Sequence, residues 1–249
     1  MKRRRSPALS DTADLLAPIV PDGTAPAAGV EGHRDRMRTR LLKAGPDALA
    51  DHEMLEMILF LALPRRDTKP LARALLYRFR SFAGVIAAPV PEMLAIEGMG
   101  EAAAAALKTV QAAALRLVRA GIEDVPILAD WQKLLAYLTA ALAHEHVEQV
   151  RVLYLDGRNR LLADEMQGRG TVNHTPVYPR EVVKRALELR STALVLTHNH
   201  PSGDPTPSRE DIAMTREIKA AAAVLRITLH DHIIIAGSRH LSFRQEGLL

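Results

Sequence analysis

The residues of this chain with the clearest chemical potential are two histidines that follow an apolar run at residues 192–197. Side chains two positions apart on an extended chain point to the same side, so His198 and His200 can face one ion. Ser208 follows after seven intervening residues, and Asp211 stands three residues beyond it. The proline-bounded segment 201–207 is typical of a tight loop that returns Asp211 toward both imidazoles.

This set of side chains is the one expected of a catalytic zinc site. The chain contains no cysteine, so a metal must be held by His, Asp or Glu. Two imidazoles and one carboxylate leave a fourth tetrahedral position open for water, as in catalytic rather than structural sites. Water on zinc becomes acidic near neutral pH, and a glutamate outside the ligand set can take its proton.

Each part of the pattern also has a simpler interpretation. Ser208 and Asp211 before an apolar helical run form the pattern of a capping box, and taken alone that reading is favoured. The His-x-His spacing recurs at residues 144–146 and 230–232, where a solvated or core role is favoured. The complete string from His198 to Asp211, in which every spacing has a use, favours the metal site.

The elements before this string are predicted to be helical. Residues 1–32 show no sustained period and predict a disordered tail. From residue 33 to residue 121 we expect an all-helical domain, because Leu55, Ile58, Leu59 and Ala62 recur at helical spacing. The expected helices cover residues 34–43, 52–63, 70–79, 91–95 and 101–119, and residues 121–126 are expected to be a linker.

The elements that contain the string alternate in type. Strands are expected at residues 150–155, 192–197 and 227–235, and helices at residues 131–143, 179–190 and 211–225. Such alternation predicts a layered α/β domain over residues 127–249. The chain as a whole is therefore predicted to be α+β, with a helical domain first.

Composition limits the classes of protein that the chain can belong to. A net charge of +4 from 33 basic and 29 acidic residues permits a nucleic-acid partner without indicating one. The longest uncharged runs fall short of the roughly 18 residues that a bilayer requires. The basic start Met1-Lys-Arg-Arg-Arg5 is followed by prolines and charges rather than by an export signal. We therefore expect a cytoplasmic protein without a membrane partner.

The string resembles the signature of the JAMM/MPN+ metallopeptidases, which is an upstream Glu, His-x-His, seven residues and Ser-x-x-Asp. Three segments, of which the first lies within the string, are similar to the bacterial RadC family (DNA repair protein RadC, UPF0758). They are His-Asn-His-Pro-Ser-Gly at 198–203, Gly-Thr-Val-Asn-His-Thr-Pro-Val-Tyr-Pro-Arg-Glu at 170–181, and Asp-His-Ile-Ile-Ile at 231–235. The resemblance covers residues 33–249 and implies an MPN (JAB/JAMM, cytidine-deaminase-like) domain.

The resemblance also implies roles for single residues. His198, His200 and Asp211 would bind Zn²⁺, and Ser208 would help to hold the oxyanion or the water. The family's glutamate lies just before the first strand of the domain, a place that Glu148 fills here. Glu145 and Glu165 are the alternatives, and any of the three can be a surface acid.

The helical half contains a second candidate site. Ile96-Glu-Gly-Met-Gly100 before an alanine-rich helix resembles the hairpin of a helix-hairpin-helix module, whose backbone amides contact phosphate. Gly98 and Gly100 would shape the turn, and Lys108 would be the nearest positive charge. An ordinary tight turn explains the glycines as well, and Glu97 and Glu101 weaken phosphate attraction.

Two functions follow from these patterns. The first is a zinc-dependent hydrolase that cleaves a peptide or isopeptide bond, with Glu148 as proton shuttle. The second is a DNA-associated module whose metal domain is accessory or structural, and both can hold together. A nuclease is less favoured, since the sequence offers one metal site and no second cluster of carboxylates for another metal. His174, Asp231 or His232 would either hydrogen-bond a ligand imidazole or belong to the core.

Overall fold

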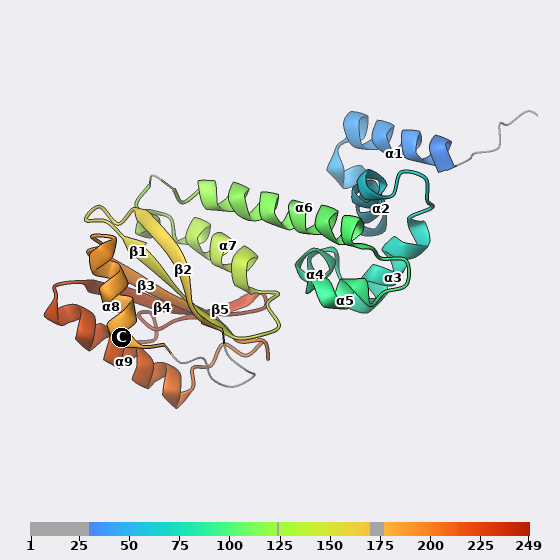
Figure 1. Ribbon diagram of the computed structural model, residues 1–249. Coiled ribbons are helices and arrows are strands. Elements are labelled where there is room, and N and C mark those ends of the chain that lie inside the picture. Colours follow the sequence, from blue (N-terminus) through green and yellow to red (C-terminus); the bar gives the residue numbers. More distant parts are fainter. Residues whose placement is uncertain (1–29, 124, 170–176) are drawn as a thin grey trace, which may run out of the picture.

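The computed structural model describes residues 30–123, 125–169 and 177–249 (Figure 1). The predicted tail at residues 1–32 therefore lies outside the described residues, apart from its last three positions. Those three positions begin the first helix, α1 (Val30–Ala44), which starts four residues before the predicted start at Arg34.

The described residues of the first half are helical, as predicted. Helices α2 (Asp51–Ala62), α3 (Lys69–Phe79), α5 (Val90–Leu94) and α6 (Glu101–Ala120) agree closely with the expected segments. The 3-10 turn η2 (Pro46–Ala48) and the short helix α4 (Phe82–Ala87) were not expected from the sequence. Helix α4 begins where the Ser81 hydroxyl accepts a 3.0 Å hydrogen bond from the Gly84 amide. Side chains from these helices enclose one hydrophobic core, which includes Leu55, Leu59, Leu75, Met93 and Leu107.

Helix α6 connects the two halves of the molecule. Its first half contributes Ala103, Ala104 and Leu107 to the core of the helical half. Val118, near the end of α6, packs against a second hydrophobic core, on one face of the sheet. Ile122 belongs to this second core. Figure 1 shows the helix extending from the helical group to the sheet. Because Ile122 is only 1% exposed, the expected linker at residues 121–126 begins within a packed core.

The described residues of the second half form a sheet of five strands in the order β2-β1-β3-β4-β5. The strands are β1 (Gln149–Leu155), β2 (Leu161–Arg169), β3 (Ala193–Asn199), β4 (Thr228–Ala236) and β5 (Arg239–Ser242). Strands β3 and β4 pair in parallel, and the other neighbours pair antiparallel. The sequence predicted β1, β3 and β4 but neither of the two edge strands, β2 and β5.

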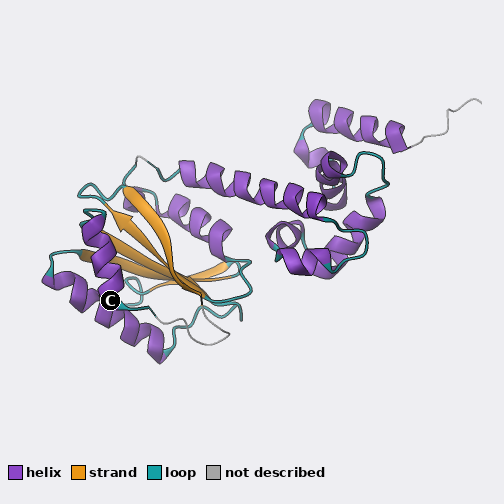
Figure 2. Cartoon of the chain, viewed as in Figure 1, coloured by secondary structure: helices purple, strands orange, loops and turns teal. Residues whose placement is uncertain are grey.

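Helices cover both faces of the sheet, as Figure 2 shows. The 3-10 turn η3 (Ile127–Ala129) and helix α7 (Trp131–Leu142) pack on one face, over Leu153, Val195 and Ile233. Helices α8 (Pro179–Glu188) and α9 (Arg209–Val224) pack on the other, over Val152, Leu194 and Leu196. The whole chain is thus α+β, with a helical region followed by a layered α/β region, as the sequence predicted.

Strand β3 lies at the centre of these layers, and all seven of its residues are buried. Helix α9 forms the crossover from β3 to its parallel neighbour β4, so the helix start faces the carboxyl end of β3. This topology brings the loop and helix after β3 next to the last residues of that strand. Among the described residues, the helices lack the length and apolar character needed to cross a membrane.

Candidate metal centre

The two histidines of the central string lie at the carboxyl end of β3. His198 is fully buried and stands opposite Val150 of β1 and Ile234 of β4. His200 lies just past the strand and remains extended because its amide donates to the Ile235 carbonyl at 2.8 Å. The Nε2 atoms of the two rings are 2.9 Å apart. The i, i+2 spacing therefore places both imidazoles on one side, as expected.

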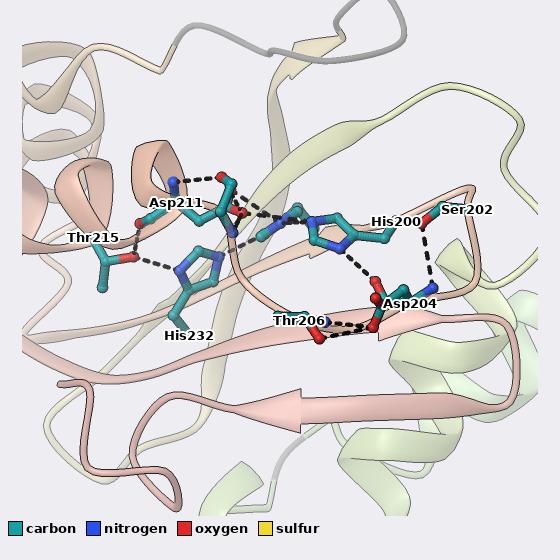
Figure 3. A network of polar contacts seen from close by, with 9 residues as sticks. His200, Ser202, Asp204, Thr206, Asp211, Thr215 and His232 are labelled. Atoms are coloured by element: carbon teal, nitrogen blue, oxygen red, sulfur yellow. Dashed lines mark hydrogen bonds and ion pairs between the residues drawn. The ribbon is translucent and has the colours of Figure 1, made fainter.

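Asp211 reaches the same place from the first turn of α9. Its Oδ1 atom lies 3.2 Å from Nε2 of His198, and its Oδ2 atom lies 3.6 Å from Nε2 of His200 (Figure 3). The residue is only 8% exposed. Among the described residues, His198, His200 and Asp211 are the three that could hold a metal ion together, because their potential ligand atoms lie within 4.8 Å of one another. These three residues are called the metal group below.

The capping box that the sequence also allowed is present too. The Ser208 amide and hydroxyl donate to Oδ2 of Asp211 at 2.8 and 2.6 Å, and the Asp211 amide donates to the Ser208 hydroxyl at 3.0 Å. Oδ1 of the carboxylate is the atom nearer to His198. One carboxylate thus holds the helix start through Oδ2 and lies close to both histidines, with Oδ1 nearest to His198 and Oδ2 nearest to His200.

The loop between His200 and Ser208 determines the orientation of the His200 ring. Nδ1 of His200 lies 2.7 Å from the backbone carbonyl oxygen of Asp204. A carbonyl only accepts, so Nδ1 carries a proton, and in the neutral ring Nε2 is the nitrogen that can bind a metal. Arg239 donates to the Gly203 carbonyl, and the Asp204 carboxylate accepts from the Thr206 amide and hydroxyl. The Arg239 contact holds the loop against β5, and the Asp204 contacts with Thr206 hold the loop's own shape.

The electrostatics of the group favour a bound positive charge. The hydrogen bond with Asp211 raises the pKa of His200, against the effect of burial. Burial would raise the pKa of Asp211, but its contacts with His198 and His200 outweigh burial and leave that pKa well below the usual range. Nitrogen lone pairs and a carboxylate that converge in a buried place suit a divalent metal ion of the zinc type. The residues present therefore fit a metal ion.

Glu148 lies directly before β1, where the sequence placed it. Val150, two residues further on, pairs with His198 in the antiparallel register of β1 and β3. The charge of Glu148 contributes to the raised pKa of His200, so the two side chains are electrostatically coupled. The use of Glu148 as a base remains a prediction.

The two alternative glutamates have other surroundings. Glu165 forms an ion pair with Arg185, with atoms 2.6 Å apart, on the face that α8 covers. The charge of Glu145 acts on Lys108 and Arg151. The charge of Glu148, in contrast, acts directly on His200.

Asn199, between the two histidines, is a positioning residue that the sequence reasoning missed. Its amide group donates to the carbonyls of Glu145 and Val147 at 3.2 and 3.1 Å, and its Oδ1 accepts from the Gln149 amide at 2.9 Å. These bonds span the backbone on both sides of Glu148. Alternation along β3 gave a signal, since a polar side chain between two ligands must point to the opposite face.

A second histidine stands behind His198. Nε2 of His232 lies 2.7 Å from Nδ1 of His198, and its Nδ1 lies 2.6 Å from the Thr215 hydroxyl. Burial lowers the pKa of His232 well below its ordinary value. Of the residues expected to contact a ligand imidazole, His232 does so. The Asp231 carboxylate accepts from Ser242 and from the amides of His232 and Arg244, and His174 lies outside the described residues.

The predicted hairpin in the helical half forms a turn between α5 and α6. Gly98 has a φ of 85°, a backbone conformation that favours glycine, and its carbonyl accepts from Arg66 at 2.8 Å. Gly100 is the residue before the first turn of α6. The Lys108 ammonium is half-buried and donates to the carbonyls of Ile86 and Ala87 and to Gln111, at 2.8 to 3.1 Å. Lys108 therefore caps the last carbonyls of α4. To contact phosphate, its ammonium would have to give up these hydrogen bonds.

A mixed sheet between helical layers, with His-x-His at the end of a central strand and an acid at the following helix start, is the arrangement of a JAB-type domain whose three residues could hold a metal ion. The family described as "RadC-like JAB domain" matches residues 128–248, and the family described as "UPF0758 N-terminal" matches residues 32–105. A curated relative, the "UPF0758 protein" of Rhodobacter capsulatus, is 58% identical over 213 residues, which is 86% of this chain and the whole of that protein. The chain belongs to the RadC (UPF0758) family.

Proposed function

We propose that this protein is a zinc-dependent hydrolase of the JAMM type that cleaves a peptide or isopeptide bond with activated water. One observation carries the proposal. Nε2 of His198, Nε2 of His200 and Oδ1 of Asp211 converge at the end of a buried strand, with separations of 2.9 and 3.2 Å from His198. Three nitrogen and oxygen ligands are the protein's usual share of a catalytic zinc site.

His198, His200 and Asp211 would hold the ion. Zinc in this place would supply a Lewis acid and lower the pKa of a water in its open position. A carboxylate ligand also fits iron, manganese or cobalt, and two imidazoles with one carboxylate are a common ligand set of catalytic zinc. The metal content of the purified protein decides this point.

Glu148 is the proposed proton shuttle. It would take the proton of the attacking water and pass it to the nitrogen of the leaving amine, which must be protonated to depart. Its coupling to His200 supports a location beside the metal group. Asn199 would keep Glu148 in reach by holding the backbone on both sides of it.

Ser208 is the proposed partner of the oxyanion or of the water. It is exposed, and its hydroxyl donates to Oδ2 of Asp211. If the hydroxyl turned toward the substrate, the Ser208 amide would still hold Asp211 through its own 2.8 Å hydrogen bond. The carboxylate would thus keep its position while the hydroxyl changes partner.

Metal analysis tests the ligand assignment. Wild-type protein purified in zinc-containing medium should carry about one zinc per chain by plasma mass spectrometry, as expected for a three-ligand site. The His198→Ala/His200→Ala double variant should lose it. A double variant that retains the zinc would refute the assignment.

Hydrolysis can be tested without a known substrate. Zinc-loaded protein is incubated with a bacterial lysate, and newly formed amino groups are tagged and identified by mass spectrometry. New α-amines report peptide-bond cleavage, and new lysine ε-amines report isopeptide cleavage. Glu165→Gln should act as wild type, whereas Glu148→Gln should produce no new amines. A wild-type protein that produces none, or a double histidine variant that produces the same ones, would contradict hydrolysis.

A DNA-associated role is the second candidate, supported by the turn at Gly98 and the start of α6. Free amides at such a helix start attract phosphate, and the exposed Arg66 lies against the turn. A surface pocket beside this turn is lined by Arg66, Asp67 and Glu97, so the charge of the pocket is mixed. Lys108 is already engaged.

Salt dependence tests this second role. Binding to duplex and branched DNA should weaken steeply between low and moderate salt if phosphates are contacted, because counterions are released. Arg66→Ala should reduce that dependence, and Arg226→Ala, a change in the sheet region, should not. Binding that is absent or insensitive to salt would remove the DNA-associated role.

A further inference from the structure

A chain of hydrogen bonds leads from the backbone of Asp211 through the core to the His198 ring. The backbone carbonyl of Asp211 accepts from the Thr215 hydroxyl at 2.6 Å, and the Asp211 carboxylate lies 3.2 Å from Nε2 of His198. Thr215 contacts Nδ1 of His232, and Nε2 of His232 contacts Nδ1 of His198. Figure 3 shows Thr215 and His232 in this arrangement beside Asp211.

The carbonyl of Asp211 determines the direction of every bond in the chain. A carbonyl has no proton to give, so the single hydroxyl proton of Thr215 points to it. Toward His232, Thr215 can then only accept, and Nδ1 of His232 must carry a proton. Because His232 is completely buried and its nitrogens contact a hydroxyl and an imidazole, the neutral ring is favoured.

A neutral His232 that is protonated on Nδ1 has its lone pair on Nε2. That atom accepts from Nδ1 of His198 over 2.7 Å, so the His198 proton lies on Nδ1. The lone pair of His198 is thereby left on Nε2, the atom that faces His200 and Asp211. This is the tautomer in which an imidazole binds a metal through Nε2.

We propose that Thr215 and His232 are positioning residues, a relay that fixes the tautomer of His198 so that its Nε2 lone pair faces the metal position. The proposal rests on the proposed function only in that the site binds zinc. Partners of this kind commonly change metal affinity by about 10- to 100-fold when they are removed. The packing supports a fixed ring, since Phe243 stacks on His232 with ring centres 4.5 Å apart.

Thr215→Val tests the relay because it keeps the shape of the side chain and removes the hydroxyl. His232 then loses the acceptor of its Nδ1 proton, and the opposite tautomer, which would place the His198 proton on Nε2, becomes accessible. We expect the zinc dissociation constant, measured by competition with a chelator, to rise about tenfold or more. Thr215→Ser keeps the hydroxyl and should bind zinc nearly as wild type does.

Thr109→Val is the matched control. Thr109 of α6 also donates to the carbonyl four residues earlier, at 2.8 Å, but contacts no histidine through that hydroxyl. Its loss should leave zinc affinity unchanged. If Thr215→Val fails to fold, Thr215→Ala removes the same hydroxyl without added bulk, and thermal unfolding checks both.

The tautomer itself gives an independent readout. Long-range proton–nitrogen spectra of metal-free, ¹⁵N-histidine-labelled protein should show the His198 proton on Nδ1 in wild type and in Thr215→Ser. In Thr215→Val they should show it partly on Nε2. Wild-type protein with the proton on Nε2, or equal zinc affinity in Thr215→Val and Thr215→Ser, would overturn the relay. Wild-type protein that binds no zinc would instead refute the proposed function, while the spectra would still decide the relay.

Discussion

The Oδ1 atom of Asp211 lies 3.2 Å from Nε2 of His198, although the two residues belong to different elements and are separated by a proline-rich loop. The contact exists because α9 starts at the carboxyl end of β3 and because Ser208 orients the carboxylate from the helix start. Helix capping and presentation of the carboxylate to the histidines are thus two uses of one side chain. Variants can separate them.

Ser208→Ala should mainly affect stability. The change removes the hydroxyl that accepts from the Asp211 amide, and loss of such a cap typically costs about 1 kcal/mol. The Ser208 amide still holds Asp211, so zinc affinity should fall less than tenfold. Urea unfolding and chelator competition measure the two effects, and a large loss of affinity with unchanged stability would contradict this division.

Asp211→Asn should show the opposite pattern. An asparagine oxygen can still accept from the Ser208 amide, so the free energy of unfolding of the metal-free protein should change by about 1 kcal/mol or less. The charge that a metal requires is lost, and zinc affinity should fall by at least about 100-fold, the outcome of removing one ligand of a closely arranged set. Retained affinity would show that Asp211 serves only the helix.

Asn199→Ala should loosen the segment that carries Glu148. It removes three hydrogen bonds and leaves the buried Gln149 amide without its acceptor, which together should cost about 3 kcal/mol. Hydrogen exchange at residues 145–149 should accelerate more than exchange in β4. Uniform acceleration over the whole sheet would show that Asn199 stabilises the domain without positioning this segment.

The ion pair of Glu165 and Arg185 predicts a pH-dependent stability. The hydrogen bond from Arg185 lowers the pKa of Glu165 below its ordinary value of 4.5. A lowered folded-state pKa stabilises the protein above the unfolded-state value, and this contribution disappears as pH falls through the folded-state value. Glu165→Gln should therefore be slightly less stable than wild type at neutral pH and equally stable in acid. Both side chains are partly exposed, so the difference in stability between Glu165→Gln and wild type should also shrink in high salt.

Gly98→Ala tests the turn before α6. The residue has a φ of 85°, and an added methyl group would collide with the Arg66 guanidinium. The left-handed conformation alone should cost about 1 kcal/mol in a non-glycine residue. Gly100→Ser is the control, because open space surrounds Gly100 and serine suits the residue before a helix. Equal melting temperatures for the two variants would contradict the role of Gly98.

The sequence predicted most helices and the convergence of His198, His200 and Asp211, because spacing along a strand and a capped helix start determines both. It did not predict β2, whose central Asp164 and Glu165 look unsuited to a covered strand. Asp164 is accommodated because Arg151 binds it at 2.9 Å and Tyr137 donates to it, and Glu165 because of Arg185. These partners come from other elements, so local composition could not reveal them.

The position of His232 shows a second limit of prediction from sequence. Leu229 packs on the face of α8 and α9, whereas Ile233 packs on the opposite face, so simple alternation is broken between them. The pairing of β3 with β4 shifts at this point, since Leu194 pairs with Leu229 and Val195 with Asp231. The shift turns His232 toward His198. Without this single irregularity of strand pairing, alternation from Leu229 would place His232 on the opposite face of the sheet, away from His198.

The most direct test of the central claim is a crystal structure of the zinc-loaded protein with anomalous scattering measured at the zinc edge. We predict one strong peak about 2.0 to 2.2 Å from Nε2 of His198, Nε2 of His200 and a carboxylate oxygen of Asp211. No peak there, with Asp211 bonded only to Ser208 at the helix start, would contradict the account.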